Sequence, residues 1–192
     1  PFILDRSEAY IGVLIDDLIT KGTNEPYRIM TSRAEYRLVL RQDNAEARLT
    51  ERAGEIGLVS KERKEAAERR KRETKRERER LEKAFMTPAK AESFLAAAGS
   101  AQIQSSVSLA ELLKRPEFDY ESLAPLDDAR KPLSRHVIAS VEVGIKYEGY
   151  IVKQYQQIAK FQKIENKRLP EDLDYEEMDG IRIEAKQKLA RH

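Results

Sequence analysis

Apolar residues recur at helical spacing along most of the chain, and glycine, proline and capping residues divide the pattern into segments. Glycines at 22, 57 and 99 follow three of these segments and predict their C-terminal ends. The longest uninterrupted pattern predicts one helix over 132–169, closed by Pro170. Further helices are predicted over residues 7–20, 45–56, 61–86, 88–99, 109–115 and 182–192, with one more turn at 120–126. The predicted fold class is all-α.

One segment allows two interpretations. Between residues 36 and 40, apolar and other side chains alternate, which is typical of a short extended segment. Arg33, Arg37 and Arg41 are also spaced four residues apart, which would align them on one face of a helix. Both interpretations place the three arginines on a common side, so the functional inference is the same for either.

Charge is the dominant feature of the composition. Charged residues make up 36% of the 192 residues and hydrophobic residues 40%, with a formal net charge of +2. The range 61–83 holds twelve Lys and Arg against seven Asp and Glu, and predicts a helix that lies largely in water. There is no cysteine, which suits a reducing cytoplasm, and no apolar run reaches the roughly 18 residues of a membrane span.

Residues suited to catalysis or metal binding are sparse. Glycines form neither a dinucleotide-binding fingerprint nor a phosphate-binding loop. His136 is interpreted as an ordinary helix residue. The adjacent acids Asp16-Asp17 and Asp127-Asp128 point in different directions on a helix, so capping and solvation explain them better than metal binding. We therefore predict no catalytic, cofactor or metal site in this chain.

Nucleic-acid binding has more support in the sequence. Four arginines fall within fourteen residues, with Tyr36 between them and Tyr27 directly before the first, and guanidinium groups bind phosphate through paired donors. Lys153 lies in a second mixture of basic and aromatic residues. The alternative is structural, with the arginines bound to carboxylates of a neighbouring protein domain. The predicted RNA-binding residues are Arg28, Arg33, Arg37, Arg41 and Lys153.

Long strings in the chain resemble the MnmG (GidA) family. The strings are LDRSEAYIGVLIDDL at 4–18, EPYRIMTSRAEYRL at 25–38, RQDNA at 41–45, RLT at 48–50, KYEGYI at 146–151 and LPEDLDY at 169–175. The resemblance covers nearly the whole chain and is weaker over 61–126. Family members often have arginine where this chain has Lys153, so the charge is kept and the bidentate geometry is lost.

The resemblance implies the C-terminal helical domain of a larger α/β flavoprotein. The family installs an aminomethyl-type group, such as carboxymethylaminomethyl, on carbon 5 of the tRNA wobble uridine. It uses FAD reduced by NADH, and it works with a GTPase of the MnmE type. FAD binds in an N-terminal Rossmann-like domain outside this chain, so we expect the chain to be inactive alone. Members are cytoplasmic homodimers, and the helical part is associated with tRNA and partner binding.

Three parts are expected along the chain. Residues 1–58 connect from the FAD domain and carry the arginine-rich motif. Residues 59–131 form the long charged helix and a small helical cluster. Residues 132–192 form the long helix and the start of a C-terminal bundle that continues beyond the chain.

Overall fold

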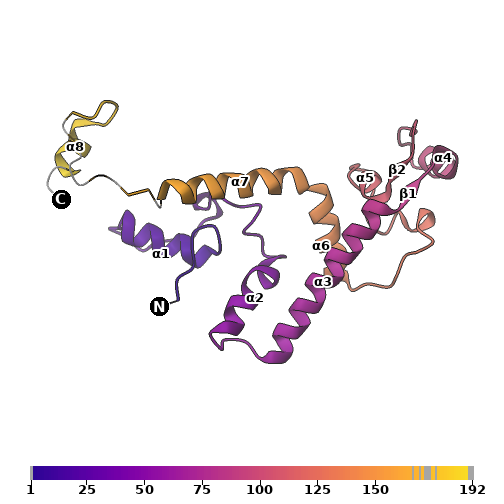
Figure 1. Ribbon diagram of the computed structural model, residues 1–192, viewed down its shortest axis with the longest axis horizontal. Helices are drawn as coiled ribbons and strands as arrows, with labels where there is room; N and C mark the ends of the chain where they lie inside the picture. Colours follow the sequence, from indigo (N-terminus) through magenta and orange to yellow (C-terminus); the bar gives the residue numbers. More distant parts are fainter. Residues whose placement is uncertain (1, 166, 169, 171–173, 176, 190–192) are drawn as a thin grey trace. The chain divides into compact units, whose positions relative to one another are not determined.

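The computed structural model of the chain is mostly helical (Figure 1). It describes residues 2–165, 167–168, 170, 174–175 and 177–189. The predicted all-α class is confirmed, with a two-stranded antiparallel sheet as the only β-structure in these residues. The elements are α1 (Tyr10–Thr20), η1 (Thr31–Arg33), α2 (Ala45–Glu55), α3 (Lys61–Lys83), β1 (Phe85–Met86), α4 (Pro88–Ala97), β2 (Val107–Ser108), α5 (Leu109–Leu113), η2 (Ala124–Leu126), α6 (Arg135–Lys146), α7 (Glu148–Glu165) and α8 (Ile183–Leu189).

The predicted helix boundaries are set by the expected residues. Gly22, Gly57 and Gly99 have φ of +64°, +75° and +63°, a left-handed conformation that side chains disfavour. The hydroxyl groups of Ser60 and Ser108 accept hydrogen bonds from the third residue of the helices that follow. Local stop and start signals therefore predicted these ends within a few residues.

The single helix predicted over 132–169 is wrong, because the chain turns at Tyr147 and forms α6 and α7 (Figure 1). Tyr147 has φ −103° and ψ 9°, outside helical geometry. Gly144 and Gly149 flank the break, and glycine lowers helix propensity. The regular apolar spacing continues through the break, so periodicity alone could not locate it.

The segment 36–40 is neither a strand nor part of a helix. It forms a turn in which the N–H groups of Val39 and Leu40 both donate to the carbonyl oxygen of Tyr36. The turn buries Tyr36, Val39 and Leu40 together, whereas a strand would send Val39 to the opposite face. The argument that placed Arg33, Arg37 and Arg41 on one side therefore loses its basis.

The hydrophobic core lies in the middle of the chain. It joins the C-terminal end of α3 to α4, α5, η2 and α6, and β1 pairs with β2 beside it. Leu81, Leu109, Leu113 and Val141 are each at most 2% exposed. Each fully buried aliphatic side chain of this kind stabilises the fold by about 1.5–3 kcal/mol. The short helices predicted between 87 and 126 are therefore part of the core itself.

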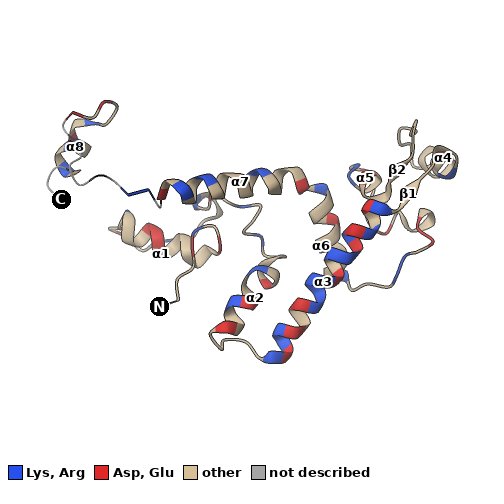
Figure 2. Ribbon diagram, viewed as in Figure 1, with Lys and Arg blue, Asp and Glu red and all other residues tan. Residues whose placement is uncertain are grey.

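More than half of the residues of the charged helix α3 are exposed, as expected, but the helix is also a central packing element. It contacts α2, α5 and α6 and buries Ala67, Glu77 and Leu81. Basic and acidic residues alternate along the rest of its surface (Figure 2). The carboxylate of Glu77 can be buried because Arg80 and the Tyr120 hydroxyl group both donate to it.

The chain divides into two compact units, residues 1–156 and 157–192, with the boundary inside α7. The second unit contains α8, which ends at Leu189, short of the predicted 192; the last three residues lie outside the described part. Part of the motif at 169–175 also lies outside it. The three-part division expected from the sequence stays a prediction. Among the described helices, none is long and apolar enough to cross a membrane.

Candidate nucleic-acid interface

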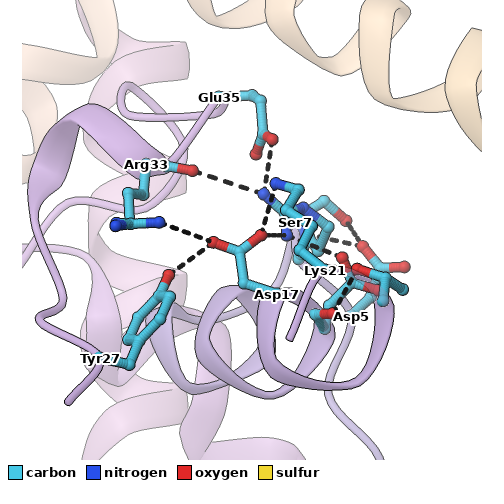
Figure 3. Close-up of polar contacts among 10 residues, drawn as sticks. Asp5, Ser7, Asp17, Lys21, Tyr27, Arg33 and Glu35 are labelled. Carbon is cyan, nitrogen blue, oxygen red and sulfur yellow. Dashed lines mark hydrogen bonds and ion pairs between the residues drawn. The ribbon is translucent and has the colours of Figure 1, made fainter. Parts of the chain in front are cut away.

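The arginine-rich segment is held by a buried carboxylate, Asp17 of α1 (Figure 3). Asp17 is 2% exposed. Its Oδ1 accepts hydrogen bonds from Arg6 at 2.7 Å and Lys21 at 2.8 Å, and its Oδ2 accepts one from the Tyr27 hydroxyl group at 2.5 Å. Arg33 Nη1 lies 3.9 Å from Oδ2 and its guanidinium group stacks 4.6 Å from the centre of the Tyr27 ring. One helix residue thus connects both ends of the loop between α1 and η1.

Arg6 is the second residue that organises this region. Its side chain is 12% exposed and donates to three carboxylates, those of Asp16, Asp17 and Glu35, at 2.7, 2.7 and 2.5 Å. It also donates to the carbonyl oxygen of Arg33 at 3.4 Å. We name Arg6, Asp17, Tyr27, Arg33 and Glu35 the Asp17 network. It fixes the backbone of residues 27–35 against α1.

The network shifts the pKa values of its members in directions that favour the charged pairs. Hydrogen bonds from Lys21, then Tyr27 and Arg6, hold the pKa of Asp17 well below its usual range. Burial alone would lower the pKa of Arg6, but its bonds to Asp17, Glu35 and Asp16 raise it. The bond to Asp17 raises the pKa of the Tyr27 hydroxyl group, which therefore stays a donor at neutral pH.

The N-terminal segment is also tied to its neighbours by close backbone approach. A Cβ at Gly12 would lie 2.3 Å from the carbonyl oxygen of Asp5, so α1 can rest on this backbone only with glycine there. Arg52 of α2 bonds to the carboxylate of Glu8, and Arg48 bonds to its carbonyl oxygen. Burial lowers the pKa of Arg48. Polar contacts from two arginines therefore join this segment to α2.

The five predicted RNA-binding residues fall into two groups. Arg33 belongs to the Asp17 network, and Arg41 pairs with Asp43 at 3.0 Å and donates to the carbonyl oxygen of Leu38. The other three, Arg28, Arg37 and Lys153, are exposed, and within the described part of the chain none has a hydrogen-bond or ion-pair partner.

The adjacent acid pairs agree with the prediction in their direction and differ from it in their environment. The expected divergence is observed, since side chains of Asp17 and Asp127 are 2% and 6% exposed while those of Asp16 and Asp128 are 36% and 85% exposed. Solvation does not explain the inner member of either pair, because Asp17 binds Arg6 and Asp127 binds Arg80. Bonds to Glu77 and Asp127 raise the pKa of Arg80.

The described residues include no group of three or more His, Asp or Glu side chains arranged to hold a metal ion. His136 is an exposed residue of α6, as predicted. A hollow of about 910 Å³ between α2, α3 and α6 is lined by charged and small side chains, including Arg41, Glu46, Arg70 and Lys71.

Sequence reasoning missed the residues that hold the site together. Asp17 follows Val13 by four residues, so it lies on the same buried helix face, and that spacing could have marked it as buried. On this helix Val13 is buried, whereas Leu18 is exposed. Arg6 gave no signal, because its partners are up to 29 residues away in sequence.

Two family models match the chain over most of its length. Residues 61–155 match the tRNA modifying enzyme MnmG/GidA C-terminal helical domain. Residues 157–192 match the MnmG/GidA C-terminal helical bundle. The bundle match thus begins within the chain, directly after the boundary between the two units.

Curated relatives and solved structures agree with these models. The chain is 58% identical over 190 residues to the tRNA uridine 5-carboxymethylaminomethyl modification enzyme MnmG of Caldicellulosiruptor saccharolyticus, and 50% identical over 188 residues to that of Bacillus velezensis. These alignments cover 98% and 97% of the chain and 30% of each relative. A crystal structure of Aquifex aeolicus GidA superposes with a TM-score of 0.74 at 34% identity, over the whole chain and 30% of GidA. The chain therefore spans about 30% of the length of the proteins that it matches.

Proposed function

Since the chain belongs to the MnmG/GidA family, whose C-terminal helical region it matches, we propose that it docks tRNA for modification of the wobble uridine. Arg28, Arg37 and Lys153 bind phosphates of the RNA backbone. Arg33 and Arg41 keep their partners within the chain and support the segment. The whole protein to which this region corresponds would install the carboxymethylaminomethyl group on carbon 5 of the uridine, with FAD and NADH bound in another domain.

The observation that carries the proposal is a set of unpaired cations on a fixed backbone. Arg28, Arg37 and Lys153 are exposed and, in the described residues, free of carboxylate partners. The Asp17 network and the turn at 36–40 hold the first two on ordered backbone, so less conformational entropy is lost when a phosphate binds. Half-buried Tyr27 is stacked by Arg33, so it supports the segment and is not available to stack on a base.

A tRNA titration of the chain by fluorescence anisotropy, repeated from low to moderate salt, tests the proposal. Each phosphate contact contributes about 0.7–0.9 to the slope of log affinity against log salt, so three contacts predict a slope of roughly two or more. Replacing Arg28, Arg37 or Lys153 with alanine should reduce the slope by about one contact each. Exposed Arg69 of α3 gives a matched control, Arg69→Ala. No binding at low salt, or equal effects of all four changes, would refute the proposal.

A second function, docking of a GTPase of the MnmE type, is favoured by a different observation. Ile11, Ile15 and Ile19 form an exposed apolar stripe on α1, with exposed fractions of 50%, 49% and 76%. Apolar stripes of this kind are typical of protein interfaces. Binding to the GTPase that withstands added salt and added tRNA, and that Ile15→Ser abolishes, would support this function. The cytoplasmic homodimer expected from the family stays a prediction.

A further inference from the structure

Gln154 of α7 reaches across to the turn that carries Arg37. Its Oε1 accepts a hydrogen bond from the N–H of Val39 at 2.8 Å, and its Nε2 donates to the carbonyl oxygen of Glu35 at 3.4 Å. Glu35 and Val39 bracket Arg37 in the sequence, 115 or more residues from Gln154. A single neutral side chain thus joins a helix to both ends of the turn.

The start of α7 is held against the core by ion pairs, so the helix that carries Gln154 has a fixed position at this end. Glu148, the first residue of α7, binds Arg78 of α3 at 2.9 Å and Lys114 at 3.2 Å. Arg78 crosses the surface of α6 at Gly144, where a Cβ would meet its side chain at 3.4 Å. Gln154 lies six residues further along, about 9 Å along the helix axis.

The bond lies beside two of the unpaired cations. Lys153 is the residue before Gln154, and Arg37 lies in the middle of the turn that Gln154 holds. The backbone positions of these two cations are therefore coupled through the amide of Gln154. An amide suits this task because it supplies one acceptor and one donor without adding a charge.

We propose that Gln154 is a positioning residue, which sets the spacing of Arg37 and Lys153 so that both bind the same stretch of RNA phosphodiester backbone. The inference rests on the proposed tRNA docking. Gln154 has no charge and cannot itself form an ion pair with a phosphate. An effect of its replacement on the salt dependence of binding would therefore come from the positions of Arg37 and Lys153.

The test is the salt dependence of tRNA binding for Gln154→Ala, with Gln156→Ala as the matched control. Gln156 is an exposed glutamine of the same helix and, within the described residues, has no partner. Gln154→Ala should lower the slope of log affinity against log salt by about 0.7–0.9, the value of one phosphate contact. Gln156→Ala should leave it unchanged. A neutral residue that only stabilises the fold would weaken binding without changing this slope.

Further variants distinguish failure of the positioning role of Gln154 from failure of tRNA docking itself. In a chain that already lacks Arg37 and Lys153, Gln154→Ala should cause no further change in the slope. Gln154→Met keeps side-chain length and helix propensity but lacks the amide, so it should lower the slope as Gln154→Ala does, and it replaces the alanine variant if that variant is poorly folded. An unchanged slope in both Gln154 variants, while Arg37→Ala still lowers it, would overturn the inference and leave tRNA docking intact. A wild-type chain that does not bind tRNA would instead refute the proposed function.

Discussion

Replacing Asp17 with asparagine should release the arginine-rich segment while leaving the hydrophobic core folded. The change keeps the shape of the side chain and removes the charge that binds Arg6 and Lys21 and orients Tyr27. Asp17 belongs to no part of the core cluster, so the loss falls on α1 and the loop after it.

The expected magnitude follows from the contacts. Breaking a buried ion pair by removing one partner typically costs about 3–5 kcal/mol, because the other charge stays buried and unpaired. Arg6 keeps Asp16 and Glu35 as partners, and asparagine can still accept one hydrogen bond. The cost should therefore be smaller, about 2–3 kcal/mol, which corresponds to roughly 30- to 150-fold faster local opening.

Native-state hydrogen exchange measures this opening residue by residue. The N–H of Arg33, bonded to the carbonyl oxygen of Met30, should exchange faster by that factor in Asp17→Asn. The N–H of Leu109, bonded to Ala84 in the core, should not change. Asp16→Asn is the matched control, because Asp16 is more exposed and has one bond to Arg6, and its effect should be several-fold smaller. Equal acceleration at Arg33 and Leu109, or none at Arg33, would show that Asp17 does not hold this segment.

Three further predictions concern pH and glycine. The pKa of Asp17 is lower in the folded chain than in the unfolded chain, so its ionised carboxylate stabilises this segment above about pH 4, and that stabilisation is lost as pH falls through the lowered pKa. Hydrogen exchange of the Arg33 N–H should therefore speed up in acid in the wild type, and Asp17→Asn should lose this acid dependence. Burial, followed by the bond to Glu77, raises the pKa of Tyr120 to about 12. Its contribution to the free energy of unfolding is therefore fully present below about pH 10, and about 2–3 kcal/mol of it should be lost by pH 12. In urea unfolding, Tyr120→Phe should lack this part of the loss of stability in alkali, and an unchanged loss would contradict the assignment. Gly12→Ala should destabilise α1 by about 1–3 kcal/mol in thermal unfolding, because its Cβ would clash with the carbonyl oxygen of Asp5, and a neutral effect would refute the close approach. Gly149→Ala, whose Cβ meets no atom of the described residues within 4 Å, should stabilise α7 by up to about 1 kcal/mol.

Local signals in the sequence predicted the helices well. Glycine stops, serine caps and apolar spacing depend on neighbouring residues, and they located α2 and α3 to within three residues. The break at Tyr147 was missed because the apolar spacing continues across it, and the contacts that fix it come from Arg78 and Lys114, far away in sequence.

The candidate site was only partly predictable for the same reason. Composition marked Arg28 and Arg37 as cations in a basic segment, and the family resemblance added weight to them. Composition could not separate them from Arg33, because the difference lies in the partner Asp17, sixteen residues earlier. Gln154 carried no signal, since a neutral glutamine on a helix surface is ordinary until its backbone partners are known.

The separation of apolar and ionic contacts along the chain has a consequence for how it unfolds. The region from α3 to α6 rests mainly on buried apolar side chains, while the segment around Asp17 depends more on charge pairs, beside a few buried apolar residues such as Val13. Guanidinium chloride is a salt as well as a denaturant and screens such pairs at concentrations too low to dissolve an apolar core, whereas urea carries no charge. In guanidinium chloride the segment around Asp17 would therefore unfold before the core, whereas in urea the two would unfold closer together. One free energy of unfolding would not describe both transitions.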